Sequence, residues 1–279
     1  MNAIVAEDAD NGVGALARGL RILSLFDVRS PEMSFIEIQN GSGLPKATTY
    51  RLLKTLVSQE FILFDEFKKR YYPGPKVMTL GFSALNAYSL VDSARHLMEE
   101  VGRETEQTVG LNIRDGVEIV TCYRVIPACN IVNVNIPIGH RAPIEKTGTG
   151  RLFLAFDKSA EFEKAFSERV LPNLDNFARK ILSEEVSFAK RHKFSYNDED
   201  TALGYRSVSV PVFKFGDQII ATLYVSAASS QLNLRALIEK AVPELRKASL
   251  KLSLILGASR ESLANLEPDI STDDLPSKL

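Results

Sequence analysis

The stretch from Ser34 to Ser58, SFIEIQNGSGLPKATTYRLLKTLVS, constrains the fold more than any other part of the chain. A short apolar-patterned segment around Phe35 is followed by a glycine break and then by Pro45. Proline suits the first turn of a helix because its missing N–H would be unpaired there anyway. Beyond it, apolar side chains recur at helical spacing on one side. We therefore expect a short helix, a glycine-containing turn and a second helix, the pattern of a helix-turn-helix.

The opposite side of the second helix is basic and hydroxylic and carries no carboxylate. It comprises Ala47, Arg51, Lys54 and Ser58, with Thr48 and Thr55 on one flank and Tyr50 on the other. Arginine and lysine can bond guanine edges or phosphates, and threonine and serine can bond either. An ordinary amphipathic helix with a solvated basic face would show the same pattern, so this helix alone leaves both interpretations open.

The residues after the second helix favour DNA binding. An apolar run, Phe61–Phe64, precedes the polar and basic segment Asp65–Arg70, and Tyr71–Gly74 follows. This pattern predicts a two-stranded hairpin with a basic tip, the wing of a winged helix. The predicted partner is double-stranded operator DNA, and the predicted contact residues are Lys46, Ala47, Thr48, Tyr50, Arg51, Lys54, Lys68, Lys69 and Arg70.

The charge of the chain is unevenly distributed. The formal net charge of −1 would by itself argue against nucleic-acid binding. Residues 14–76, however, hold ten lysines and arginines against six aspartates and glutamates, whereas residues 77–279 hold 24 against 26. The cations are local, as an electrostatic footprint should be. Their excess is modest, so we expect binding to need two or more copies of the module.

Three motifs in this region resemble the IclR family of bacterial transcription regulators in both order and spacing. They are LARGLRIL from Leu16, LPKATTYRLL from Leu44 and YPGP from Tyr72. The resemblance implies a winged helix-turn-helix and an assembly of homodimers or dimers of dimers. It also implies that the rest of the chain forms an effector-binding domain similar to the GAF fold.

The pattern of the remaining chain predicts such a domain. Residues 76–91 are apolar or small on more than one side, which fits either a linker helix packed on a second chain or a plain core helix. After a helix at 92–107, the Asp115-Gly116 turn gives a strong hairpin signal between strand patterns. Further strands are expected at 130–136, 194–197, 206–213 and 218–226, and helices at 151–156, 160–169, 175–193 and 232–256.

These elements predict an α+β fold in which helices pack against an antiparallel sheet. The expected layout is a disordered arm at 1–13, a winged helix-turn-helix at 14–75, a linker helix at 76–92, an effector-binding domain at 93–258 and a disordered tail at 259–279.

A second informative stretch runs from Glu145 to Phe156, EKTGTGRLFLAF. Small and hydroxyl residues lead directly into a helix, whose first N–H groups are unpaired within the helix and carry partial positive charge. Such a helix start can hold a carboxylate, and glycine lets a ligand approach the backbone closely. An N-cap with a tight turn would require the same residues. In the family that the chain resembles, this loop and helix start line the effector pocket.

Two more stretches, residues 196–212 and 221–226, also resemble the family. Many members have an acidic residue, a cysteine and a serine where this chain has Asn197, Ser207 and Tyr224, whereas Ser226 keeps the family's serine. Unless these positions only pack, the changes disfavour a small keto-acid effector. They favour a flat aromatic acid or amide-like derivative, since a phenol ring offers a wall for stacking. The predicted effector-binding residues are Asn133, Thr147, Gly148, Thr149, Gly150, Asn197, Ser207, Tyr224 and Ser226.

The sequence offers no catalytic, metal or cofactor site. Its three histidines, His96, His140 and His192, lack metal-binding spacing, and its two cysteines fit reduced thiols better than a disulfide framework or a zinc site. A cytoplasmic location is expected, without a membrane span or signal peptide. We predict a ligand-responsive transcription regulator of a catabolic operon, without a cofactor. The rival classes are an enzyme with an α+β catalytic domain and a sensor that does not bind DNA.

Overall fold

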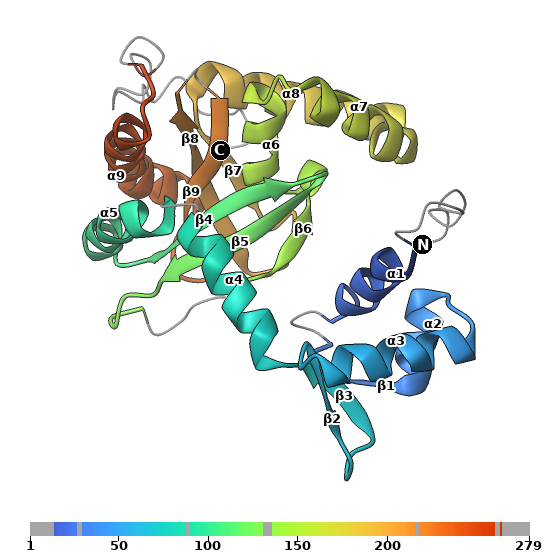
Figure 1. The fold of residues 1–279 in the computed structure, drawn as a ribbon. Helices are drawn as coiled ribbons and strands as arrows, with labels where there is room; N and C mark the ends of the chain where they lie inside the picture. Colours follow the sequence, from blue (N-terminus) through green and yellow to red (C-terminus); the bar gives the residue numbers. More distant parts are fainter. Residues whose placement is uncertain are drawn as a thin grey trace. The chain divides into compact units, whose positions relative to one another are not determined.

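A computed structural model gives the structure of the protein. It describes residues 14–26, 30–87, 90–130, 136–215, 218–259 and 263. The chain divides into two compact units, Met1–Ala87 and Tyr88–Leu279, and each is described here by itself (Figure 1). The arm expected at 1–13 lies outside the described residues, as does the tail expected at 259–279 apart from residues 259 and 263.

The first unit combines helices with a small sheet. Its first three helices are α1 (Gly14–Leu23), α2 (Phe35–Ser42) and α3 (Lys46–Ser58). Its antiparallel sheet has the order β1-β3-β2, formed by β1 (Met33–Ser34), β2 (Ile62–Asp65) and β3 (Arg70–Pro73). The core is a cluster of four buried side chains, Ile22, Ile38, Leu53 and Ile62. Burial of this cluster from all three helices and β2 holds the unit together.

Local sequence sets the ends of the two central helices. The Ser34 hydroxyl accepts from the Glu37 N–H at 3.3 Å while the Glu37 carboxylate accepts from the Ser34 N–H at 2.7 Å, which is a capping box at the start of α2. Gly43, with φ of 65°, ends α2 in the left-handed conformation that glycine adopts freely. Pro45 directly precedes α3. The helix-turn-helix is therefore confirmed, and the β2–β3 hairpin supplies the wing.

The next two helices differ slightly from expectation. α4 runs from Pro75 to Ala87 and α5 from Leu90 to Thr105, with residues 88 and 89 outside the described part of the chain. The sequence predicted one helix ending at residue 91 and another starting at 92. Leu90 and Val91 are instead buried in the first turn of α5. Their burial explains why the second unit begins earlier than the apolar pattern suggested.

The second unit is built on one six-stranded antiparallel sheet with the order β6-β5-β4-β9-β8-β7. The strands are β4 (Thr108–Asp115), β5 (Glu118–Val125), β6 (Arg141–Pro143), β7 (Ser195–Asp198), β8 (Tyr205–Lys214) and β9 (Gln218–Ala228). The remaining helices are α6 (Gly148–Phe156), α7 (Ala160–Arg169), α8 (Asn176–His192) and α9 (Leu234–Ile255). The α+β fold class is confirmed.

Helices cover both faces of this sheet. α5 and α9 pack against one face, and α6, with α8 beside it, lies on the other (Figure 1). The strand expected at 130–136 falls mostly outside the described residues, and β6 was not expected. α6 starts at Gly148 rather than at Arg151, because the Thr147 hydroxyl caps it by accepting from the Gly150 N–H at 2.9 Å.

Candidate functional site

The outer face of α3 presents the side chains that a DNA-reading helix needs. Lys46, Tyr50, Arg51 and Lys54 are exposed. No carboxylate among the described residues lies within ion-pair distance of Lys46, Arg51 or Lys54. Their charges are therefore available to phosphates or base edges.

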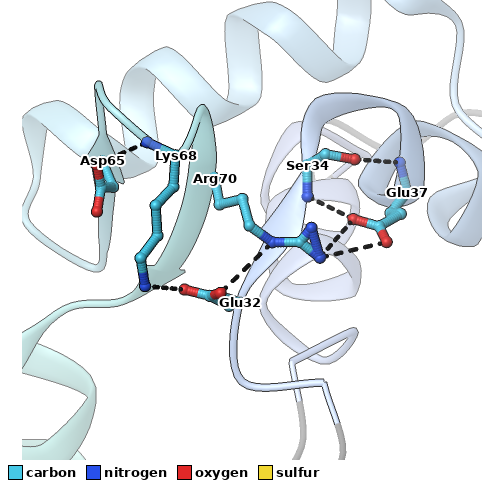
Figure 2. Close-up of polar contacts among 6 residues, drawn as sticks. All are labelled: Glu32, Ser34, Glu37, Asp65, Lys68 and Arg70. Atoms are coloured by element: carbon cyan, nitrogen blue, oxygen red, sulfur yellow. Dashed lines mark hydrogen bonds and ion pairs between the residues drawn. The ribbon is translucent and has the colours of Figure 1, made fainter.

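The wing presents its cations differently (Figure 2). Lys68 Nζ lies 3.1 Å from a Glu32 carboxylate oxygen, and the Arg70 guanidinium lies 3.2 Å from Glu37 and 3.7 Å from Glu32. The backbone N–H of Ser34, and to a smaller extent Arg70, hold the pKa of Glu37 below its ordinary value. Two of the three predicted wing cations are thus already paired within the unit.

A concave surface of about 630 Å³ joins the start of α3 to the wing. Four of the predicted DNA-binding residues line it, together with Phe35, Phe64 and Tyr71: they are Lys46, Ala47, Tyr50 and Lys69. A second groove of about 530 Å³ lies between α1 and α3 and is bordered by Thr48 and Arg51. Lys46, Ala47 and Tyr50 of α3 therefore share one concave surface with Lys69 of the wing, whereas Thr48 and Arg51 border the other groove.

In the second unit, the two faces of the sheet differ in polarity although both are buried. Alternate residues such as Leu111, Val210 and Leu223 form a fully buried apolar face. The opposite face carries buried polar side chains from four strands, namely Asn112, Asn197, Ser207, Ser209, Thr222, Tyr224 and Ser226. Burying polar groups is unfavourable unless they find partners. Such a face is therefore typical of a binding site rather than of a structural core.

Thr149, in the first turn of α6, fastens that helix to the polar face. Its hydroxyl lies 3.2 Å from Asn112 Nδ2, 3.3 Å from Ser209 Oγ and 3.4 Å from Thr222 Oγ1. On the β7 side, Asn197 Nδ2 donates to Thr201 Oγ1 at 3.1 Å. These bonds satisfy the amide nitrogens of both asparagines but not their oxygens.

A small cavity of about 60 Å³ remains between α6 and the sheet. Two buried oxygen atoms without a hydrogen-bond partner belong to residues that line it: Asn112 Oδ1 and Asn197 Oδ1. Leaving such an atom unpaired costs about 1–3 kcal/mol. The cavity is large enough for ordered water but far below the ~300–1,000 Å³ of common ligand pockets.

Tyr224 occupies much of the space above the sheet. Its side chain is only 3% exposed, and a Cβ atom added to Gly110, its cross-strand partner, would lie 2.1 Å from the ring. The ring therefore passes over β4 and reaches β5. Burial raises the pKa of the phenol, and Tyr205 adds to this, while Arg124 and Thr121 near the hydroxyl act weakly the other way. The phenol stays neutral and polar at any physiological pH.

The start of α6 also forms part of the cavity wall. A Cβ atom at Gly150 would lie 1.8 Å from the Ile144 carbonyl oxygen, and one at Gly148 would lie 2.8 Å from that of Tyr196. Both glycines are thus required by close packing of backbone, a physical reason other than the ligand approach inferred from the sequence. Gly148 nevertheless lines the cavity. The Gly150 N–H donates to Thr147, so the N–H groups of Gly148 and Thr149 are the potential donors of the first helical turn.

Most of the predicted effector-binding residues meet at this cavity. Thr147, Gly148, Thr149, Asn197, Ser207 and Tyr224 line it. Gly150 and Ser226 do not, and Asn133 lies outside the described residues. Sequence reasoning missed eight lining residues, namely Asn112, Ile119, Thr121, Ile136, His140, Ala142, Thr201 and Tyr205. The alternation of polar and apolar residues along the strands was the available signal.

In the described part of the chain, no cluster of three or more histidine, cysteine, aspartate or glutamate side chains could hold a metal ion. The helices of that same part include none long and apolar enough to span a membrane.

Comparison with known proteins places both units. The IclR helix-turn-helix domain matches residues 15–66, and the bacterial transcriptional regulator IclR C-terminal domain matches residues 82–254. The HTH-type transcriptional regulator XynR of Escherichia coli (strain K12) is 26% identical, over 88% of this chain and 98% of that protein. The Pca regulon regulatory protein of Pseudomonas putida is 25% identical, over 84% and 81%.

Solved structures show the same fold. The crystal structure of an IclR homolog complexed with 4-hydroxybenzoate, from Microbacterium hydrocarbonoxydans, superposes with a TM-score of 0.70 at 20% identity, covering 87% of this chain and 98% of that one. Proteins of this kind regulate transcription and are not enzymes. With its helix-turn-helix and its matched C-terminal domain, the chain belongs to the IclR family of bacterial DNA-binding transcription regulators.

Proposed function

We propose that a small organic effector, bound in the cavity between α6 and the sheet, controls operator binding by this regulator. The observation that carries the proposal is that two residues lining one cavity, Asn112 and Asn197, each carry a buried side-chain oxygen without a hydrogen-bond partner. Folding leaves these atoms without partners, and a ligand that supplies donors or acceptors recovers the lost hydrogen bonds. The effector is a flat aromatic acid or amide-like derivative, and the regulated genes are catabolic.

The chemistry of the walls supports this ligand class. The two asparagine oxygens accept hydrogen bonds, so they suit hydroxyl or amide donors on a ligand. The first turn of α6 suits a carboxylate, because its N–H groups and the helix dipole favour negative charge. The Tyr224 ring offers a flat apolar wall once it turns away from Gly110. The related structure complexed with 4-hydroxybenzoate supports an acid of this kind.

A ligand screen tests the proposal. Thermal shift measurements with aromatic acids and their amides should find a binder, which at 100 times its Kd stabilises the protein by about 2.7 kcal/mol. In calorimetry, Asn112→Ala and Asn197→Ala should then each weaken binding at least about tenfold, since each removes a buried acceptor. Asn176→Ala, an exposed residue at the start of α8, is the matched control. Equal affinity in all three variants would place the effector elsewhere.

Operator binding by a symmetric dimer or dimer of dimers is part of the same proposal. A module with a small cationic excess gains affinity when two copies engage two half-sites at once. In α4, Met78 is 64% exposed and Leu80 is 57% exposed in the single chain. An apolar helix surface of this kind suits contact with a second copy. The protein acts where the operator DNA is, in the cytoplasm.

A further inference from the structure

The tip of the wing carries an apolar side chain that the fold does not use. Phe67, in the turn between β2 and β3, is fully exposed. The hairpin has aromatic packing of its own, because the Phe64 and Tyr71 rings lie 4.6 Å apart. Phe67 takes no part in this contact, so its exposure gains nothing for folding and leaves a large apolar surface in water.

The turn that presents Phe67 is well defined. The Asp65 carboxylate accepts from the Phe67 N–H at 2.9 Å and from the Lys68 N–H at 3.0 Å. The second of these bonds is the main reason why the pKa of Asp65 lies below its ordinary value. Lys69 follows with φ of 55°, a left-handed conformation that reverses the chain. The phenylalanine is therefore held at the apex by local hydrogen bonds.

The charges next to Phe67 are arranged to hold the wing in place. Lys68 and Arg70 pair with Glu32 and Glu37, which lie just before and within the first turn of α2 (Figure 2). These pairs tie the hairpin to the helix-turn-helix. Lys69 lines the concave surface shared with Lys46 and Tyr50 of α3. The hairpin thus continues the surface of α3 and projects beyond it.

DNA geometry indicates what this apex meets. The major groove is about 12 Å wide and admits a helix, whereas the minor groove is about 6 Å wide and takes narrow elements. An element beside the reading helix crosses the phosphate backbone and reaches the next groove, as the arms of other helix-turn-helix proteins do. In other proteins that bind the minor groove, apolar side chains such as phenylalanine insert as wedges between base steps.

We infer that Phe67 is the DNA contact of the wing, packing in the minor groove next to the major groove that α3 reads. Lys68 and Arg70 position the hairpin through Glu32 and Glu37. The inference rests on the proposed reading role of α3, and it assigns the wing an apolar contact in place of the basic one that the sequence suggested.

Salt dependence separates an apolar contact from an ionic one. The probe is a duplex selected from a random pool by the full-length parent protein. Phe67→Ala should weaken binding at least about tenfold, the effect of exposing a buried phenylalanine. The slope of log K against log salt should stay unchanged, because no phosphate contact is lost. Phe177→Ala, which removes a 73% exposed phenylalanine from α8, is the matched control and should leave binding unchanged.

Footprinting locates the contact. Hydroxyl-radical protection of the minor groove beside each half-site should be present with the parent protein and absent with Phe67→Ala. Parent-like affinity in Phe67→Ala, or a loss accompanied by a shallower salt slope, would overturn the inference. The Arg51→Ala variant tests the proposed function separately. If both Phe67→Ala and Arg51→Ala bind like the parent, the reading role of α3 is wrong. If only Arg51→Ala binds more weakly, the role of Phe67 alone is rejected. Melting curves confirm folding of each variant.

Discussion

Among the described residues, the exposed face of α3 and the cavity of the second unit both contain polar groups without protein partners. The groups on α3 are hydrated, whereas those in the cavity are buried. Arg51 and Lys54 lie in solvent, which satisfies them fully until DNA arrives. Asn112 Oδ1 and Asn197 Oδ1 are buried, so their unpaired state is unfavourable in the folded protein. The α3 face can therefore bind its partner without reorganising. In the cavity, a ligand that hydrogen-bonds the buried oxygens would remove an unfavourable contribution to the free energy of the folded protein.

The same contrast separates the affinity for DNA, which depends on the α3 face, from the response to an effector, which depends on the cavity. A solvated cationic face sets how strongly the protein holds DNA, with a dependence on salt. In the structure the Tyr224 ring lies over Gly110. The effector binding proposed above requires a second arrangement, in which the ring is displaced. A ligand that binds only the second arrangement shifts the balance between them. The cavity is thus the region suited to a switch, and the α3 face to a constant contact.

Gly110→Ala should have the largest effect on stability, because the added methyl group would occupy the space that the Tyr224 ring fills. The new methyl group would lie 2.1 Å from the Tyr224 ring, so the ring must leave its place or the strands must separate. We expect a loss of about 1–3 kcal/mol in the free energy of unfolding, typical of overpacking. Chemical denaturation of the full chain measures it.

A double mutant shows whether the clash is with the ring. Gly110→Ala combined with Tyr224→Ser should recover at least about 1 kcal/mol of the loss, because the clashing group is gone. Tyr224→Ser alone should bind flat ligands less tightly, since the stacking wall is missing. Gly19→Ala in α1, where an added Cβ meets nothing, should not destabilise the protein. Additive losses in the double mutant would show that Tyr224 is not what the glycine accommodates.

Arg51→Ala and Lys54→Ala come next and should affect only operator binding, because both residues lie on the exposed face of α3. Each should weaken operator binding by about 1–3 kcal/mol if the residue contacts a base, with relaxed sequence preference, or weaken all sequences alike if it contacts a phosphate. Mobility-shift titration at several salt concentrations distinguishes these cases. Melting temperature and ligand response should not change. Lys164→Ala on α7 is an exposed control, and variants indistinguishable from it would remove α3 from the reading role.

The two regions also differ in how far the sequence predicts them. The α3 face is local: its residues recur along one helix, so periodicity and charge were enough to define it. The cavity draws on all six strands of the sheet, and Asn112, Thr121 and His140 lie far from the recognised motifs. Their role depends on which strands become neighbours, which the sequence pattern left open. Only the polar–apolar alternation along β8 and β9 indicated a buried polar face.

Other details needed side-chain contacts rather than patterns. The sequence showed three wing cations but not that Glu32 and Glu37 pair with two of them, since the paired residues are 36 and 33 positions apart in the chain. It showed glycines before α6 but not that the Ile144 and Tyr196 carbonyls require them. Phe67 was hidden within a polar and basic segment. In each case the deciding contact joins residues distant in sequence.

The smallest expected effect is a change in the salt dependence of DNA binding when the wing cations lose their acidic partners. The wing would then carry unpaired cations, as α3 does among the described residues. In Glu32→Gln with Glu37→Gln, Lys68 and Arg70 lose their carboxylates. Glutamine at residue 37 still completes the capping box of α2, so the helix start should persist. Each cation that reaches a phosphate steepens the salt slope by about 0.9, so we expect a change of roughly 1–2 with tighter non-specific binding.

The outcome depends in part on the Glu37 carboxylate being ionised at neutral pH. The pKa of Glu37 is lowered, first by the Ser34 N–H, so the ionised form is favoured in the fold. Its contribution is present above the ordinary glutamate pKa and is lost only as pH falls through the lowered value. At pH 7 the pair between Glu37 and Arg70 is therefore intact in the parent protein. Adding Lys68→Gln and Arg70→Gln should return the slope to that of the parent. An unchanged slope in the double glutamine variant would mean that these cations lie out of reach of phosphates, as expected if the wing meets DNA through the apolar contact of Phe67.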